Sequence, residues 1–269
     1  MNDKALKEFL APIRDNEWKI PADINNDALL EDLLTHIGHI DPVLRDHLVL
    51  ECLWTLIDKD YLSDDKQKWL LEQLMSEKYL FYGVGKEDND SVFTRTFSVL
   101  IVGVLGYKLQ DFDYHAVLEP LIRYGYEEVD YRGYVQGKGW AHATAHLSDA
   151  LNSFAQHQQV TEMELKKLLA LIQAKIGVSK YGYIHGEDER MARTTETIFR
   201  NDQLNKVDII NWVKSFKKEE GDYDVVCLKN GNVKNFLRSL YFRLRKSGYD
   251  REIIDVIDNV MIEEFSVRY

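Results

Sequence analysis

Apolar residues recur three or four positions apart along most of this chain, which is the spacing of a helix with one buried face. Asp41-Pro42 is a typical helix start, because an N-cap residue precedes a proline whose fixed φ suits the first helical position. The segment that follows keeps the helical period, with apolar residues at Val43, Leu44, Leu48, Leu50, Leu53, Trp54 and Ile57. The pattern therefore predicts a helix that begins at Pro42.

Three further helix starts are visible in the sequence. Ser63 precedes two aspartates and an apolar period, Ser91 precedes the most apolar stretch, and Thr161-Glu162-Met163-Glu164 is a capping box. The apolar stretch at 97–107, FSVLIVGVLGY, covers only about half of the roughly 20 residues that a helix needs to span a bilayer. We predict a helix buried on most sides and no membrane span.

The helix starts are separated by roughly 20 to 27 residues, so two consecutive helices occupy around 45 residues. This length is in the range of repeats that are built from paired helices. No run of alternating apolar and polar residues convincingly predicts a strand. We predict an all-α fold, a curved stack of antiparallel helical hairpins resembling an α-solenoid, with a closed α/α toroid as the alternative. Because no long or low-complexity linker interrupts the chain, we predict a single domain over residues 1–269.

Two residues interrupt the helical pattern. Pro120 lies inside an otherwise helical period, where a proline costs about 3 kcal/mol, so we expect either a kink or a helix end near Glu119. Arg95 places a charge just inside the most apolar helix, and a buried arginine needs a carboxylate partner. We expect an ion pair with a neighbouring helix, with Asp46 and Asp130 as candidates.

Length and charge limit the classes of function. The chain has 269 residues, with 34 Lys and Arg against 45 Asp and Glu, and a formal charge of −11. Because affinity for nucleic acid depends on cations that displace counterions, this balance argues against a nucleic-acid partner. Two distant cysteines, Cys52 and Cys227, fit reduced thiols, and the charged N-terminus lacks the apolar core of a signal peptide. We predict a cytoplasmic protein.

The stretch 130–149, DYRGYVQGKGWAHATAHLSD, is the one segment with the pattern of a site. Its glycines predict a flexible turn, after which we expect Trp140 to begin a helix. His142, His146 and Asp149 then fall at i, i+4 and i+7, which places them on one helical face.

This spacing has three interpretations. Two neutral imidazoles one turn apart can share a divalent metal, although the glutamate base of helical zinc sites is missing here. In a metal-free pocket, a histidine would act as general base, Asp149 would orient it, and Arg132 and Lys138 would favour an anionic group at the helix N-terminus. The third interpretation is a structural network that locks one helix against the next. No phosphate loop, nucleophile elbow or dinucleotide motif occurs, and we predict no cofactor and no resident metal.

The run RGYVQGKGWAHATAHLSD resembles the signature of a bacterial family known only as domain of unknown function 2785. Segments 41–46 (DPVLRD), 91–97 (SVFTRTF) and 186–190 (GEDER) fit the same family. The resemblance covers roughly residues 29–199, and it implies a helical bacterial cytosolic protein without implying any activity. It also implies one functional or structural unit, and hence a candidate ligand-binding site, made of Arg132, Trp140, His142, His146, Asp149, Glu187 and Arg190.

Glu187 and Arg190 stand three residues apart at a predicted helix start. Glutamate suits the positive end of the helix dipole, and the arginine can pair with it locally. A surface helix start with a weak ion pair is the simpler interpretation, and the resemblance adds a functional one.

The C-terminal part differs from the rest in charge. Residues 234–251 contain six cations and one acid along an apolar stripe, which is typical of a helix that meets an acidic partner or a membrane surface, or of a solvated outer face. Residues 1–65 contain 15 acids and 6 bases, whereas residues 201–269 contain 12 of each. This uneven distribution would allow the chain to associate head to tail with itself.

Three classes of function fit these observations. The first, which we favour, is an interaction or scaffold module that binds a protein or peptide partner. The second is an enzyme or a binder of an anionic small molecule, whose site is the helix with the two histidines. The third is a metal-dependent hydrolase that uses the same histidines as ligands. Whether the protein is an enzyme stays open from the sequence.

Overall fold

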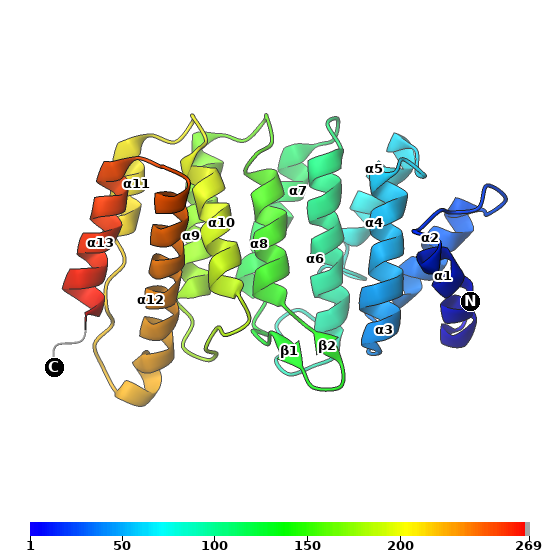
Figure 1. The fold of residues 1–269 in the computed structure, drawn as a ribbon, viewed down its shortest axis with the longest axis horizontal. Helices are drawn as coiled ribbons and strands as arrows, with labels where there is room; N and C mark the ends of the chain where they lie inside the picture. The colour runs from blue at the N-terminus through cyan, green and yellow to red at the C-terminus, as the bar shows by residue number, and fades with distance from the viewer. Residues whose placement is uncertain (267–269) are drawn as a thin grey trace. The chain divides into compact units, whose positions relative to one another are not determined.

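The computed structural model describes residues 1–266, whose regular secondary structure is almost entirely helical (Figure 1). The prediction of an all-α fold is confirmed, and a two-stranded hairpin is the exception within these residues. The chain divides into two compact units, Met1–Ala150 and Leu151–Tyr269. The curved stack, the toroid and the single domain remain predictions. Between residues 1 and 266, no helix combines the length and the apolar character that crossing a bilayer requires.

Unit 1 contains the elements from α1 to the first part of α8, and the division between the units falls within α8. In chain order these elements are α1 (Asp3–Asp15), α2 (Asn26–His36), α3 (Pro42–Leu44), the π-helical turn η1 (Arg45–Leu50), α4 (Glu51–Asp58), α5 (Asp64–Leu74), α6 (Ser91–Lys108), α7 (Tyr114–Glu127), β1 (Tyr134–Val135), β2 (Gly139–Trp140) and α8 (Ala143–Phe154). Unit 2 continues with α9 (Glu162–Ile176), α10 (Glu187–Phe199), α11 (Lys206–Lys214), α12 (Tyr223–Lys246) and α13 (Arg251–Phe265).

Three of the predicted helix starts are confirmed by their caps, and α6 begins at Ser91, as predicted, without a side-chain cap bond. The carboxylate of Asp41 accepts a hydrogen bond from a backbone N in α3 at 2.8 Å, and the hydroxyl of Ser63 accepts one at the start of α5. Thr161 and Glu164 form both reciprocal bonds of the capping box at α9. Each cap satisfies backbone N–H groups that have no partner within the helix, which is why these short motifs fix the helix starts.

α6 is the core helix of unit 1, as its apolar sequence predicts. It packs against α4 and α5, and most of its side chains between Val92 and Leu105 are buried. Gly103 allows the backbone of α8 to approach closely, because a Cβ at this position would lie 2.8 Å from the Cα of Ala150. Since α6 is buried on most sides, a polar group on it such as the guanidinium of Arg95 needs a partner inside the protein.

α7 continues through Pro120 as far as Glu127, so a helix end near Glu119 is wrong. The proline removes one backbone donor from the helix and costs about 3 kcal/mol. This cost is offset because each buried apolar side chain contributes roughly 1.5–3 kcal/mol. Four such side chains surround the proline, namely Val117, Leu118, Leu121 and Ile122.

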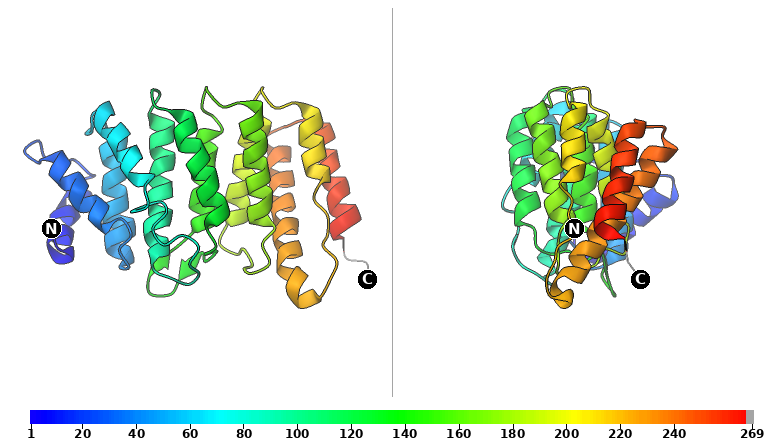
Figure 2. Two further views of the ribbon diagram at one scale, coloured as in Figure 1. Left: turned by 180° about the vertical axis from the view of Figure 1, so that it is seen from behind. Right: turned by 90° about the vertical axis from the view of Figure 1, so that its left-hand side faces the viewer.

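α12 is the central helix of unit 2. It packs against α10 and α13, which Figure 2 shows from two further sides, and it also contacts α9. The helix ends at Lys246, and α13 begins at Arg251, so the basic segment predicted as one helix over 234–251 is divided between two. Gly248, with a φ of 65°, lies in the connection and allows the chain to turn. The buried face of α12 consists of Asn232, Val233, Phe236, Leu237, Leu240 and Leu244.

Candidate functional site

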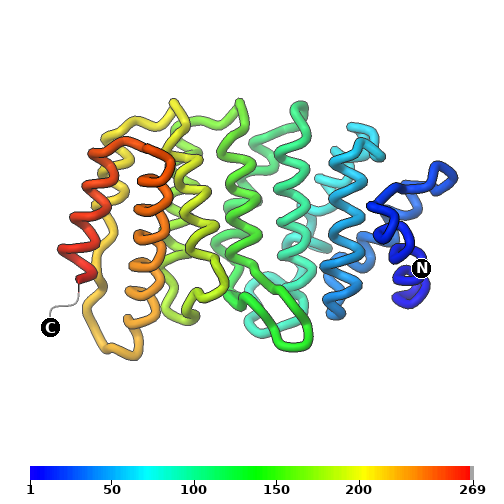
Figure 3. Tube along the Cα trace, viewed as in Figure 1, coloured from blue at the N-terminus to red at the C-terminus, as the bar shows by residue number. Residues whose placement is uncertain are grey.

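The candidate site begins at a β-hairpin that connects α7 to α8 (Figure 3). Its two strands pair antiparallel, with Tyr134 opposite Trp140. The prediction that Trp140 begins a helix is wrong, because α8 starts only at Ala143. The sequence favours a hairpin here because Gly137 and Gly139 adopt φ values of 76° and 79°, which cost little without a Cβ.

His142, the residue before α8, adopts a strained backbone conformation. Its φ of 50° is in the left-handed region, which costs a residue with a Cβ roughly 1–2 kcal/mol. Its backbone N donates to the carbonyl of Arg132 at 3.0 Å, and its carbonyl accepts from the backbone N of His146 at 2.9 Å. Its ring stacks on Trp140 at a centroid distance of 4.3 Å. Strain of this kind persists only where neighbouring contacts hold it, and it clusters at functional sites.

His146 lies in the first turn of α8 and is oriented by α6. Its Nδ1 donates to the carbonyl of Thr96 over 3.1 Å, so in the neutral ring Nε2 carries the lone pair. The ring makes edge contacts with Phe97 and His142, at centroid distances of 5.3 and 5.7 Å. Both histidines are 6% exposed. The structure therefore brings the two predicted histidines together in a largely buried position.

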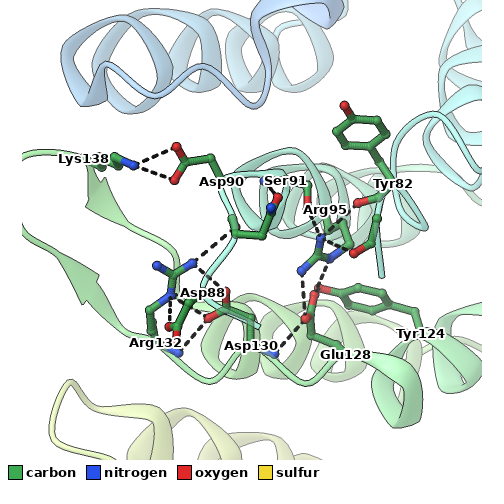
Figure 4. A network of polar contacts seen from close by, with 12 residues as sticks. Tyr82, Asp88, Asp90, Ser91, Arg95, Tyr124, Glu128, Asp130, Arg132 and Lys138 are labelled. Carbon is green, nitrogen blue, oxygen red and sulfur yellow. Dashed lines mark hydrogen bonds and ion pairs between the residues drawn. The ribbon is translucent and has the colours of Figure 1, made fainter. Parts of the chain in front are cut away.

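The other predicted residues of unit 1 are placed differently. Asp149 is half-buried on α8, three residues after His146. Arg132 directs its guanidinium to Asp130, with Nε and Nη2 at 2.9 and 2.6 Å from the carboxylate oxygens (Figure 4). The hydrogen bond from Arg132 to Asp130 is the main cause that raises the pKa of Arg132. The charge expected to hold an anionic ligand is thus balanced by a carboxylate inside the protein.

Arg95 is fully buried, and its ion-pair partner is Glu128, so the candidates Asp46 and Asp130 are both wrong. Nε and Nη2 of Arg95 donate to the two carboxylate oxygens of Glu128 at 2.6 and 3.0 Å (Figure 4). A bidentate pair of this geometry offsets the cost of burying both charges. Further hydrogen bonds join the pair to the carbonyls of Tyr82 and Gly83, the hydroxyls of Ser91 and Tyr124 and the backbone N of Asp130.

Two cations tie the hairpin segment to the loop before α6. Nζ of Lys138 lies 2.7 Å from both carboxylate oxygens of Asp90, and Nε of Arg132 lies 3.4 Å from a carboxylate oxygen of Asp88 (Figure 4). These contacts add to the backbone pairing of the strands. Because they hold both sides of a two-stranded hairpin, which is marginally stable alone, they favour a single orientation of it.

Arg45 fixes the hairpin from a third side, that of η1. Its guanidinium is fully buried over the rings of Phe93 and Phe97, at 4.2 and 4.8 Å from their centroids. Nη1 donates to the carbonyl of His39 and Nη2 to the carbonyl of Lys138, each at 2.7 Å. A buried guanidinium thus joins η1, α6 and the hairpin, which combines cation–π contact with directed hydrogen bonds.

Asp46 is the counterion of Arg45, at 2.7 Å from its Nε, and it accepts a hydrogen bond from the backbone N of Trp140. Burial is the largest influence and raises the pKa of Asp46, while the charge of Arg45 opposes it. There is no room for a side chain at the adjoining glycine: a Cβ on Gly139 would lie 2.7 Å from Cβ of Pro42 and 3.0 Å from Nη2 of Arg45. The backbone of the hairpin at Gly139 therefore lies directly against side chains of α3 and η1.

In unit 2, Glu187 is the first residue of α10, as predicted, but it is only 1% exposed. Its carboxylate accepts a hydrogen bond from the backbone N of His185 at 2.9 Å. Gly186, with a φ of 85°, makes the turn into the helix. Arg190 is half-buried one turn further on. The simpler interpretation, an exposed helix start, therefore does not describe Glu187.

For a metal site, the described residues offer His142 and His146 as candidate ligands and no third ligand beside them. Across the described residues 1–266, no group of three His, Cys, Asp or Glu is placed so that it could hold a metal ion. His142 and His146 supply imidazoles at 5.7 Å between ring centroids, and a structural or catalytic zinc site takes three or four protein ligands.

Sequence reasoning missed several members of this network, chiefly Arg45, Glu128 and Asp90. Glu128 follows Glu127 in a run that reads as an exposed helix end. Arg45-Asp46 offered a usable signal, because a charged pair interrupts an apolar helical period directly after the cap at Asp41. The sequence predicts Asp46 as a candidate partner of Arg95, whereas in the structure Asp46 pairs with Arg45.

The fold and the site define an all-α protein in which buried arginine–carboxylate pairs hold a short β-hairpin and a histidine pair beside it. The chain belongs to the family described as protein of unknown function (DUF2785), which matches residues 80–242. The match begins later and ends later than the resemblance over 29–199 predicted. No curated protein and no solved structure matches the chain.

Proposed function

We propose that this protein is an interaction module, and that it binds a protein or peptide partner through the outer side of its β-hairpin. We call this the hairpin surface and define it by Tyr134, Lys138 and Trp140. Tyr134 is 51% exposed and Trp140 39%, and their rings meet edge to face at 5.0 Å. Tryptophan and tyrosine are the side chains that contribute most often to hot spots at protein interfaces.

The observation that carries this proposal is the rigid support beneath the two exposed rings. The backbone of the hairpin is held by Arg45 and Asp46 from one side, and Lys138 is held by Asp90 from another. A surface that is ordered before binding loses less conformational entropy on association. The buried charges are therefore interpreted as the scaffold that presents the aromatic pair.

The hairpin surface is tested by site-specific photocrosslinking. A photoreactive phenylalanine analogue at position 134 is expected to give a discrete crosslinked product with a partner in cells, and Trp140→Ala in the same chain is expected to reduce its yield at least about tenfold. Met163, which is 69% exposed on α9, is the control position and should not give that product. Equal products from positions 134 and 163, or a yield unchanged by Trp140→Ala, would contradict the proposal.

A second candidate, a site for an anionic small molecule, is favoured by one observation, the strained φ of His142 beside the ring of Trp140. This site would use the unit 1 residues His142, His146, Trp140, Asp149 and Arg132. Glu187 and Arg190, which the resemblance adds, are a separate candidate in unit 2. A cytoplasmic location suits either function. The same site would also serve an enzyme. Nε2 of His146 has a lone pair, which would act as a general base or, in a metal-dependent hydrolase, as a metal ligand.

The second candidate is tested with His146→Asn, since the asparagine amide keeps a donor for the Thr96 carbonyl and removes Nε2. A thermal-shift screen of small carboxylates and phosphates should find a compound that stabilises the wild type and not the variant. Elemental analysis of both proteins tests the metal. If no compound shifts the wild type, or if the same shift persists in the variant, the histidine pair is a structural feature.

A further inference from the structure

α12 carries a row of cations on the side that faces away from the core of unit 2. Positions 234, 238, 242 and 245 repeat every three to four residues and therefore lie on one helical face, about 17 Å long. Arg238 and Arg245 are exposed, and Phe242 between them is 64% exposed. We call this face the basic stripe and define it by Lys234, Arg238, Phe242, Arg245 and Lys246.

The cations of the basic stripe lack the carboxylate partners that several other described cations of unit 2 have. Within residues 1–266, none of its four cations takes part in an ion pair. Other cations of unit 2 do pair with acids, as seen for Lys166, Arg200, Lys206, Lys217, Lys229, Arg243 and Arg251. Like charges one turn apart destabilise a helix slightly, and an anionic partner would relieve that repulsion.

Unit 1 carries a surface of opposite charge. The exposed carboxylates of Asp58, Asp60 and Asp64 all act on Lys108, which pairs with Asp60 at 2.8 Å. On the neighbouring side, Lys68 pairs with Asp111 and is also influenced by Asp64 and Asp65. Five acids thus lie with three lysines, Lys59, Lys68 and Lys108, and the next lysine along the chain, Lys66, pairs with Asp27 instead. We call these acids the acidic patch: Asp58, Asp60, Asp64, Asp65 and Asp111.

Exposed aromatic side chains accompany the acidic patch as well. Trp54, 48% exposed, precedes Asp58 by one turn on α4, and Tyr107, 70% exposed, adjoins Lys108 at the end of α6. The acidic patch therefore offers both elements that the basic stripe requires, carboxylates for the cations and apolar surface for Phe242.

We propose that the basic stripe of one copy of this chain binds the acidic patch of a second copy. The two surfaces are different, so the contact is heterologous, and each associated pair leaves one basic stripe and one acidic patch unused. Association then continues with rising concentration instead of stopping at a dimer. Because the contact is charged and at the surface, salt weakens it.

Other anionic partners fit the basic stripe less well. A helix that inserts into a membrane surface exposes a broad apolar face, but the apolar face of α12 is buried and the stripe adds only Phe242. A nucleic acid would be repelled by a chain whose formal charge is −11. A second copy of the chain also carries −11, but its acidic patch places carboxylates and exposed aromatic rings together, which gives the basic stripe a local match in both charge and apolar surface.

Sedimentation velocity of the full chain tests the proposal. At about 20 mM salt, where the Debye length is roughly 20 Å, the mean sedimentation coefficient should rise with protein concentration, and at about 300 mM salt the protein should be a monomer. Lys234→Glu with Arg238→Glu should raise the dissociation constant at least about tenfold at low salt. The control, Lys218→Glu with Arg251→Glu, changes the charge equally outside α12 and should behave as the wild type.

A mixing experiment makes the two surfaces distinguishable. Asp58→Lys with Asp111→Lys removes charge from the acidic patch in a chain that keeps the basic stripe, and Asp58 at the last position of α4 tolerates a lysine. Each double variant alone should be a monomer, and an equimolar mixture should form a one-to-one complex, since one intact pair of surfaces remains. A monomeric wild type at low salt, or two variants that fail to combine, would overturn the proposal. So would a monomeric wild type that binds anionic lipid vesicles or duplex DNA.

Discussion

Glu128→Gln is expected to lower the free energy of unfolding of unit 1 by about 3–5 kcal/mol, because it leaves the fully buried guanidinium of Arg95 without a counterion. The carboxylate of Glu128 accepts hydrogen bonds from Arg95, Tyr124 and the backbone of Asp130. A glutamine of the same shape has one acceptor oxygen, and its amide N–H groups would face donors. This effect is a large fraction of the total stability of a typical domain.

Urea denaturation followed by tryptophan fluorescence measures the effect. Four of the five tryptophans belong to unit 1, namely Trp18, Trp54, Trp69 and Trp140, so the signal reports mainly on that unit. The control is the adjacent substitution Glu127→Gln, which removes only an exposed pair with Arg123 and should cost at most about 0.5 kcal/mol.

A second variant separates a lost counterion from a general loss of packing. Arg95→Met combined with Glu128→Leu removes both charges and should recover most of the stability lost in Glu128→Gln, since an apolar pair needs no counterion. If Glu128→Gln and Glu127→Gln proved equally mild, the buried pair would not be a main stabilising element of unit 1.

Gly139→Ala is expected to destabilise unit 1 by about 3 kcal/mol or more. The alanine must adopt a left-handed φ of 79°, at a cost of roughly 1–2 kcal/mol, and its Cβ would lie 2.7 Å from Pro42 and 3.0 Å from Arg45. Relieving that overlap costs a further 1–3 kcal/mol or so, because η1 and the hairpin must separate. The separation would also break the hydrogen bond from Arg45 to the carbonyl of Lys138.

Gly137→Ala is the matched control in the same hairpin. Its φ of 76° imposes the same backbone strain, but nothing lies within 4 Å of the added Cβ. We therefore expect a loss of only about 1–2 kcal/mol, and the difference between the two variants isolates the contact with η1. Urea midpoints measure both. Equal losses would mean that backbone strain alone makes glycine necessary at position 139 and that the anchoring contact contributes little.

These two experiments also bear on the proposed function. If the anchors of the hairpin are as strong as the contacts indicate, Gly139→Ala should reduce crosslinking from position 134 even though Tyr134 and Trp140 are unchanged. Gly137→Ala should leave the crosslink intact. Comparing the crosslinking yields of the two variants separates the contribution of the exposed rings to partner binding from that of the contacts that hold the hairpin in place.

The sequence predicted helix starts correctly where the atoms that fix the start belong to neighbouring residues. The cap at Asp41, the cap at Ser63 and the capping box at Thr161 each depend on atoms within three residues, so they are legible without any tertiary information. The α6 helix was equally clear, because its apolar run is too continuous for a surface. Of the two outcomes predicted at Pro120, a kink or a helix end near Glu119, the helix end is wrong, because the apolar contacts that bury α7 outweigh the local cost of the proline.

The hairpin shows where such reasoning stops. The glycines marked a turn correctly, but the helical spacing from Trp140 onward suggested a helix that starts three residues too early. The segment before α8 is instead held as a hairpin by the contact of Gly139 with Pro42 and Arg45, far earlier in the sequence, and by the backbone hydrogen bonds of His142 to Arg132 and Gly133. The spacing of apolar and polar residues along the chain does not reveal either contact.

By itself the sequence determined the all-α class, most helix starts, the proximity of His142 to His146 and the need of Arg95 for a carboxylate. Each follows from periodicity, from capping or from the cost of burying a charge. Only the tertiary structure decided that Glu128 is this carboxylate, that Arg132 is already paired with Asp130, and that Tyr134 and Trp140 remain exposed on a fixed hairpin. Partner choice among many acids depends on which segments pack together, and packing is a property of the whole fold that no short stretch of sequence encodes.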